Sequence, residues 1–419
     1  MNKKKSKKKK STIGIMKKTI TNYFKKKEEK TTFSVIEVII IILISIMFGV
    51  IVGYLINYSR NDTSKDPNLS KIVTTYNDIV NNYYEKVDKE EMSNNAIKGM
   101  VEALNDPYSN YLNVEQSGDF NEEIDGSFVG IGVEILNGEE YTTVVKVFVD
   151  SPAEKYGVKV DDQIIKVNGN DVKGLPGSEL AKLIRGKRKT KVDITVLRKG
   201  KEIDISLIRD VVDLESVSSN IIKYEDKSIG YIRIESFAAN TYSQFYKALK
   251  ALEVKKVDSL IIDVRDNPGG HLLQTKQILS LFFNSKTVIY QIKSKKNTEK
   301  VYSISNESRK YPVAILINGN SASASEILAS CFKENYKKSI IVGTTTYGKG
   351  TVQKTHSFSN GTTIKYTAER WLTSRGKDIN KKGVKPTVEI EQNDAYYENP
   401  IDENDVQLQE ALKQLKESN

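Results

Sequence analysis

The hydrophobic pattern along the chain begins with one long apolar segment. Residues 38–56, VIIIILISIMFGVIVGYLI, carry no charge over nineteen positions. A helix of this length spans roughly 28 Å, about the thickness of the hydrocarbon layer of a bilayer. Because no polar face interrupts it, the segment predicts a transmembrane helix rather than a buried core helix. A cleaved signal peptide is the competing interpretation, but the apolar run is long for one and no A-x-A cleavage site follows.

Beyond this segment the pattern changes three times. Two stretches with apolar residues at helical spacing come first, short alternating runs divided by Gly and Asn turns follow, and apolar strands then alternate with helices. The last of these patterns favours a layered α/β domain. The predicted regions are a basic cytoplasmic tail (1–32), a transmembrane anchor (33–58), a linker (59–68), a helical N-terminal region (69–125), a β-rich module (126–210), an α/β core (211–392) and a C-terminal helical region (393–419).

Charge gives the predicted anchor an orientation. Residues 1–30 hold thirteen lysines against Glu28 and Glu29, which is more positive charge than the whole chain's net +10, so the remainder is nearly neutral. By the positive-inside rule this tail faces the cytoplasm, and the chain from about Asn57 onward lies outside a cell membrane that it crosses once. A lysine-rich tail also suits nucleic acid, but its place beside the apolar segment argues against that partner.

Cysteine and histidine limit the chemistry. Cys331 is the single cysteine, which excludes an intrachain disulfide, and His271 and His356 are the only histidines. A zinc site made of the usual Cys and His ligands cannot be assembled from these side chains. We therefore expect no metal and no other cofactor.

The segment NGNSASASEIL, residues 318–328, places three serines where a buried-strand pattern gives way to a helical one. Free N–H groups and positive potential at a helix N-terminus favour a developing negative charge, so a serine here can act as a nucleophile. The same residues also fit a purely structural role, because Ser323 and Glu326 have the spacing of a capping box. The sequence of this segment alone leaves both interpretations open.

A nucleophilic serine needs a base, and one lysine is well placed to be it. Lys349 lies between two glycines in VGTTTYGKGTVQ, directly after a buried-strand pattern. Desolvation lowers the pKa of a lysine, and a neutral amine can accept the serine proton. Gln353 follows four residues later, and its amide can orient the amine if the strand bends there. A lysine in an ordinary loop remains the alternative for this turn.

The β-rich module resembles a PDZ domain, through GIGVEI and SPAEKYGVKVDDQIIKVNGNDV. In that family an extended C-terminal peptide adds to an open sheet edge, and amides of a Gly-containing loop hold its carboxylate. Asp161 and Lys189 stand where glycine is usual in the family. A structural module with an empty groove is the alternative. The resemblance implies that the peptide-binding residues are Gly130, Ile131, Gly132 and Val133, with Arg185 as a sensor of the bound peptide.

Together, SASASEI, YGKGTVQ, DVRDNPGG and the PDZ-like module closely resemble the carboxyl-terminal processing, or tail-specific, serine proteases, over about 69–415. The resemblance implies a crotonase-like α/β core with an inserted PDZ domain. It makes Ser323 the nucleophile, Lys349 the general base and Gln353 its orienting partner. One residue inserted in CFKENYKKSIIVG leaves Ser325 as the alternative nucleophile.

The resemblance implies further features of the site and its partners. Backbone amides of Ala324 and of Gly269 or Gly270 would hold the oxyanion, and His271 is expected at the surface. Substrates would be proteins or peptides with exposed C-terminal tails, cut by a membrane-anchored endopeptidase outside the cytoplasm. A homodimer is expected through the helical N-terminal region and the last helix. A non-catalytic PDZ scaffold on the same fold is the alternative function.

Overall fold

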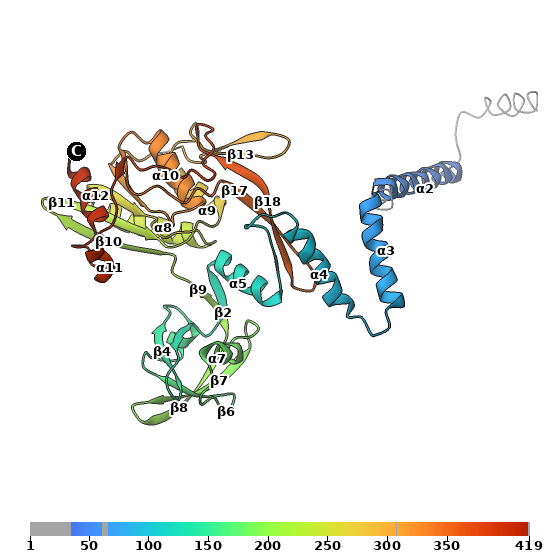
Figure 1. Cartoon of the computed structure of the whole chain (residues 1–419), viewed down its shortest axis with the longest axis horizontal. Coiled ribbons are helices and arrows are strands. Elements are labelled where there is room, and N and C mark those ends of the chain that lie inside the picture. Colours follow the sequence, from blue (N-terminus) through green and yellow to red (C-terminus); the bar gives the residue numbers. More distant parts are fainter. Residues whose placement is uncertain (1–34, 61–65, 307, 418–419) are drawn as a thin grey trace, which may run out of the picture. The chain divides into compact units, whose positions relative to one another are not determined.

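The computed structural model describes residues 35–60, 66–306 and 308–417 (Figure 1). The chain divides into two compact units, residues 1–94 and 95–419. The basic tail predicted over 1–32 lies outside the described residues.

The first unit contains two described helices, α2 (Val35–Arg60) and α3 (Pro67–Asn82). The Val35–Gly53 part of α2 has a mean hydropathy of 3.1 and none of it is buried, so by length and composition this helix is able to cross a membrane. The Asp66 carboxylate caps α3 by accepting the Asn68 N–H. Both helices lie over segments for which the hydrophobic pattern predicts helix.

The second unit begins within α4 (Lys89–Glu102). A short strand, β1 (Asn110–Leu112), and the helix α5 (Val114–Asp125) follow. Asn113 and Gln116 form a capping box at the start of α5, and Gly126 ends the helix in the left-handed conformation, with φ 64°. The chain therefore turns sharply where the β-rich module begins.

The β-rich module has its own sheet and its own apolar core. The chain enters it through β2 and leaves it through β9, and these two strands pair antiparallel. Asp161 and Lys189, which replace the usual glycines, have φ of 70° and 66°, so both adopt the left-handed conformation expected there. The elements are β2 (Ser127–Gly130), β3 (Val133–Leu136), β4 (Thr142–Val147), α6 (Pro152–Lys155), β5 (Gln163–Val167), β6 (Asn170–Asp171), α7 (Gly177–Ile184), β7 (Lys191–Arg198), β8 (Lys201–Ile208) and β9 (Asp210–Asp213).

The α/β region is built on a six-stranded sheet with the order β10-β11-β12-β15-β16-β19. Strand β10 pairs antiparallel with β11, and all the later pairs are parallel. This agrees with the predicted alternation of strands and helices. The strands are β10 (Val217–Tyr224), β11 (Lys227–Ile234), β12 (Ser259–Asp263), β15 (Val313–Ile317), β16 (Ser339–Gly343) and β19 (Val388–Glu389).

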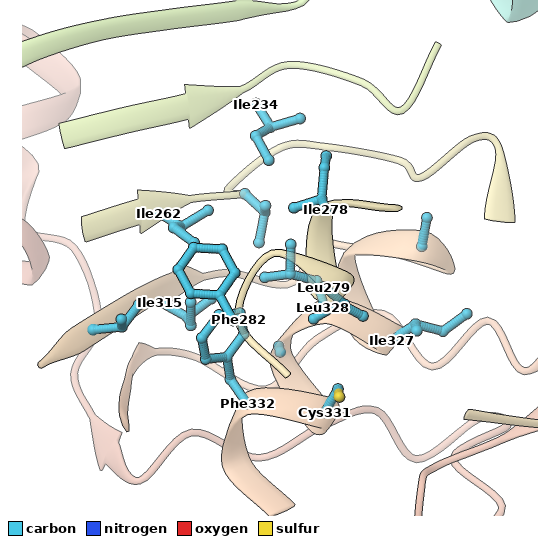
Figure 2. Packing of buried hydrophobic residues seen from close by; sticks show 14 of the residues in the cluster. Ile234, Ile262, Ile278, Leu279, Phe282, Ile315, Ile327, Leu328, Cys331 and Phe332 are labelled. Carbon is cyan, nitrogen blue, oxygen red and sulfur yellow. The ribbon is translucent and has the colours of Figure 1, made fainter. Parts of the chain in front are cut away.

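Helices cover both faces of this sheet, so β12 and β15 are buried along their whole length. On one face Ile262 and Ile315 pack against α8 (Thr241–Val254), α9 (Leu272–Ser280) and α10 (Ala324–Asn335). Figure 2 shows the Phe282 and Phe332 rings in this layer, and their centroids lie 5.1 Å apart. On the other face, the apolar side of α12 (Val406–Glu417) packs against alternate residues of the same strands.

A second, antiparallel sheet carries the segment of the predicted base. Its order is β1-β18-β13-β14, with β17 on the other side of part of β18. Its strands are β13 (Val288–Lys293), β14 (Thr298–Tyr302), β17 (Thr351–Ser357) and β18 (Thr363–Leu372). The short helix α11 (Asp394–Glu398) lies between β19 and α12 along the chain.

Candidate active site

Ser323 lies between the end of β15 and the first turn of α10. Its φ of 54° and ψ of −109° put a non-glycine residue in a rarely populated conformation, of the kind that persists where surrounding contacts enforce it and that clusters at active sites. The residue is half-buried, whereas Ala322 and Ala324 on either side are buried. The strand-to-helix turn thus presents this serine differently from its neighbours.

The other two serines of the segment have structural bonds. The Ser321 hydroxyl donates to the Val264 carbonyl at 2.8 Å, and the Ser325 hydroxyl donates to the Asn267 carbonyl at 2.9 Å. Both side chains are fully buried. Ser325, the alternative nucleophile, is therefore enclosed and engaged in a hydrogen bond.

The buried Glu326 carboxylate joins the serine segment to the lysine segment. One oxygen accepts the backbone N–H groups of Ser323 at 2.8 Å and Lys349 at 2.9 Å. The other accepts the Gly348 N–H at 2.7 Å and the Thr346 hydroxyl at 2.6 Å. Burial raises the pKa of Glu326, and these hydrogen bonds act against the rise. The capping spacing read from the sequence thus also links the two predicted catalytic residues.

The Lys349 side chain is half-buried. Burial lowers the pKa of its amine, the positive charge of Lys365 lowers it further, and the carboxylates of Glu326, Glu123 and Asp106 oppose the change. Among the described residues, this amine forms no ion pair and no side-chain hydrogen bond. In particular, it forms none with the Ser323 hydroxyl. The backbone carbonyl of Lys349 accepts the indole N–H of the buried Trp371 at 2.8 Å.

Gln353 lies on β17 where the ladder with β18 shifts register, between Val352 and Gln353. The strand therefore has the irregularity that the sequence analysis required. The Gln353 amide forms no hydrogen bond with the Lys349 amine, however, and its nitrogen donates instead to the hydroxyls of Thr351 at 3.0 Å and Thr367 at 3.2 Å. The structure brings Ser323 and Lys349 together at Glu326 and leaves Gln353 bonded within its own sheet.

The NPGG loop packs directly against the serine turn. A Cβ on Gly269 would lie 2.8 Å from the Ser323 Cβ, so only glycine fits this approach. The Gly269 N–H is already used, because it donates to the Asn267 side-chain oxygen at 2.8 Å. In the described part of the chain, the N–H groups of Gly270 and Ala324 form no hydrogen bond, so of the two predicted glycines Gly270 keeps a free donor.

His271 is the first residue beyond this loop, and it is less exposed than the predicted surface position implies. The side chain is half-buried, and its Nε2 atom is enclosed without a hydrogen-bond partner among the described residues. The residue is the N-cap of α9, and its side chain forms no capping hydrogen bond.

The five predicted peptide-binding residues line one groove of about 300 Å³ in the PDZ-like module. A Cβ on Gly132, at φ 84°, would lie 2.3 Å from the Ser151 Cβ, which explains the glycine. Strand β3 beside the groove pairs only with β4 among the described strands, so its other edge is open. The Arg185 guanidinium pairs with Glu122 at 3.3 Å and lies 5.9 Å from the centre of the Phe128 ring.

Comparison with known proteins assigns the family. Residues 228–390 match the model of peptidase family S41, residues 129–208 match the PDZ domain and residues 55–116 match the N-terminal domain of the activating protease CtpB. The chain belongs to peptidase family S41, the serine proteases that include the carboxy-terminal processing proteases, and it carries a PDZ domain.

Two relatives from Bacillus subtilis agree with that assignment. The chain is 39% identical over 360 residues to the carboxy-terminal processing protease CtpB of Bacillus subtilis, covering 85% of this chain and 73% of that protein. It is 39% identical over 334 residues to CtpA of the same organism, covering 79% and 71%. Among solved structures, the photosystem II D1 C-terminal processing protease is 26% identical, covers 77% of this chain and 86% of that chain, and gives a TM-score of 0.45.

Proposed function

We propose that the chain uses a catalytic dyad, Ser323 and Lys349, to cleave protein substrates. The neutral Lys349 amine accepts the proton of the Ser323 hydroxyl as its oxygen attacks the peptide carbonyl, and the resulting ammonium returns the proton to the leaving amine. The N–H groups of Ala324 and Gly270 stabilise the oxyanion, and Gln353 orients the amine once substrate is bound. The observation that carries the proposal is the shared Glu326 oxygen, which accepts the main-chain N–H of both Ser323 and Lys349.

The amine must move onto the serine for this step. Catalytic hydrogen bonds are often long or absent without substrate and tighten when it binds. The lowered pKa of Lys349 supports the role, because a desolvated amine loses its proton at a lower pH than an exposed one. The crotonase-like architecture remains part of the same proposal, and it rests on the family resemblance.

Substrate selection is assigned to the PDZ groove. A C-terminal tail would add to the open edge of β3, and its carboxylate would bind the N–H groups of the loop that contains Gly132. Ile135 and Ile184 make much of the groove apolar, which favours an apolar last residue. Proteins with exposed, apolar C-terminal tails are the proposed substrates, and Arg185 is the proposed sensor of their binding.

The proposed location is a membrane surface. Helix α2 supplies an anchor of sufficient length and hydropathy. By the positive-inside rule, the lysines that precede it in the sequence support a cytoplasmic start and a protease outside, and nucleic acid is not a proposed partner. The domain boundaries given by the hydrophobic pattern are part of this proposal.

We also propose that the chain forms a homodimer through α3, which lies in the first compact unit. Leu69, Ile72, Val73 and Ile79 recur at helical spacing along this helix, and all four are exposed. An apolar stripe of this kind is typical of a helix that packs against a partner. The exposed residues therefore support the second copy that the family resemblance suggests, with the last helix as the other contact.

The test is proteolysis by the full chain in detergent. Ser323→Ala and Lys349→Ala should each lower cleavage of an unfolded casein-like protein by roughly a thousandfold or more, since each removes a member of the dyad. Lys354→Ala is the matched control, because this exposed lysine on β17 pairs with Glu369, away from the proposed dyad. Thermal melting checks that the variants fold. Full activity in either dyad variant would show that the catalytic residues are different ones.

A further inference from the structure

One aromatic ring contacts the Lys349 amine and has no part in the proposed dyad. The Lys349 Nζ lies over the Tyr108 ring, 5.0 Å from its centre. An ammonium within about 6 Å of a ring centre is attracted by the ring's negative face. Within the described residues the amine forms no hydrogen bond and no ion pair, so this ring contact is the specific interaction that holds it.

Tyr108 is itself held firmly in a tight turn. The Asp106 carboxylate accepts the Tyr108 N–H at 3.2 Å and the Ser109 hydroxyl at 2.6 Å. The Tyr108 hydroxyl lies 3.4 Å from that of Tyr347, which is two residues before Lys349. Directly after the turn, β1 pairs with β18, with Asn110 opposite Lys365. The turn that carries the ring is therefore fixed to the sheet that carries the base.

The same turn also reaches Gln353, through Thr367. The Ser109 hydroxyl oxygen accepts the Thr367 N–H at 3.0 Å, and the Thr367 hydroxyl accepts the Gln353 amide at 3.2 Å. Gln353 and Thr367 are opposite each other in the β17–β18 ladder. Four consecutive residues, 106–109, thus support both the proposed base and its proposed partner.

We propose that Tyr108 is a positioning residue of the protease, whose ring holds the Lys349 amine in the candidate site until it moves onto Ser323, and stabilises the ammonium that forms when the serine gives up its proton. This inference rests on the proposed Ser-Lys dyad. In the step, the serine O–H bond breaks, an N–H bond forms on the amine, and the serine oxygen bonds the carbonyl carbon. Positive charge develops on the amine during this step, and a ring face preorganised for a cation stabilises it.

Other charged groups face the Lys349 amine and also influence its pKa. They come from four elements and comprise Lys365 on β18, Glu326 on α10, Glu123 on α5 and Asp106 in the turn. The Tyr108 hydroxyl itself stays protonated, because its bond to Tyr347 and its burial raise the pKa of Tyr108 to about 12. Below that pH the ring acts as a neutral aromatic face, and none of these charges changes when the ring is removed.

The first measurement needs no catalysis. In the full chain with Ser323→Ala, competitive acetylation of Lys349, quantified by mass spectrometry across pH, reports the pKa of the amine. Tyr108→Leu keeps apolar bulk but removes the ring, so the pKa of Lys349 should move lower because the ammonium loses its stabilisation. Tyr108→Phe keeps the ring and should leave the titration unchanged. Tyr108→Met takes the place of the leucine variant if melting shows that leucine does not fold.

The second measurement is cleavage by the same variants with Ser323 restored. Tyr108→Leu should lower kcat about tenfold with little change in KM, because the flexible lysine loses its support. Tyr108→Phe should stay within about threefold of the parent, since the aromatic face remains. Tyr347→Phe is the matched control, because it breaks the same hydroxyl contact and leaves the ring over the amine.

The outcomes separate the two proposals. Equal titration curves for the leucine and phenylalanine variants, or a leucine variant that cleaves as fast as the parent, would overturn the role of Tyr108. Cleavage that persists in Ser323→Ala would overturn the dyad instead, and the acetylation curve would still decide whether the ring stabilises the ammonium.

Discussion

The serine side and the lysine side of the candidate site are built differently. Ser323 follows β15, a fully buried strand of a sheet covered on both faces, and the serines on either side of it are bonded to buried carbonyls. Lys349 precedes β17, a strand whose residues are half-buried or exposed, and its amine contacts one ring. The fold therefore fixes the proposed nucleophile closely and holds the proposed base by few contacts. A base held in this way is able to move when substrate arrives, whereas the serine turn is not.

Glu326 is where the two sides meet, so changing it should have the largest effect. Glu326→Gln keeps the shape, but it removes the negative charge and turns an NH₂ group toward buried donors. We expect kcat to fall by roughly a hundredfold or more, because the Ser323 and Lys349 backbones lose their common acceptor. We also expect about 3 kcal/mol less stability, since buried N–H groups are left unpaired. Peptidase kinetics and urea unfolding measure the two effects.

The comparison for this variant is Glu369→Gln, on β18. Glu369 pairs with the exposed Lys354 and should tolerate the change with less than about 1 kcal/mol lost. If Glu326→Gln were as active and as stable as Glu369→Gln, the carboxylate would be a helix cap and nothing more.

The next prediction concerns the looser side and its pH dependence. The base must be neutral, so cleavage should rise with pH through the pKa of Lys349, which lies below the usual lysine range because of burial and the Lys365 charge. Lys365→Met should move this acidic limb to higher pH, and Lys354→Met should not move it. A limb unaffected by Lys365→Met would mean that another group titrates.

The lowered pKa of Lys349 should also make the free energy of unfolding depend on pH. Between the lowered pKa and the ordinary one, the folded chain holds fewer protons at Lys349 than the unfolded chain does. This group therefore makes the folded state more stable as pH rises through that window. Lys349→Met should remove that part of the pH dependence, which urea unfolding at several pH values measures.

The sequence predicted more about the serine segment than about the lysine segment. The alternation of strand and helix predicted the α/β layering, and the serine segment was placed correctly at a strand-to-helix turn because local spacing determines both features. The glycines proposed for the PDZ groove came instead from the family resemblance, and the close approach of Ser151 to Gly132 is consistent with a glycine there. The position of the free Gly270 donor was beyond this reasoning, because it depends on the Asn267 side chain.

What the sequence could not predict depends on contacts between distant segments. Glu326 was read as a cap, yet it also binds a segment more than twenty residues away, and no local pattern encodes that. Tyr108 lies far along the chain from Lys349, and the pairing of β1 with β18 brings them together. The enclosed Nε2 atom of His271 was not predicted either, and no pattern in the local sequence indicates it.

The smallest effect is expected at Ser325, inside the tightly held side. Ser325→Ala removes a buried hydroxyl that donates to the Asn267 carbonyl. We expect roughly 1 kcal/mol less stability from the lost bond, and a kcat within about threefold of the parent, because Ser323 and the Gly270 donor keep their places. Thermal melting and peptidase assays measure both. Loss of all cleavage in Ser325→Ala, with Ser323→Ala still active, would assign the nucleophile to Ser325. The buried, hydrogen-bonded hydroxyl would then be the reactive one, and the half-buried Ser323 would not be.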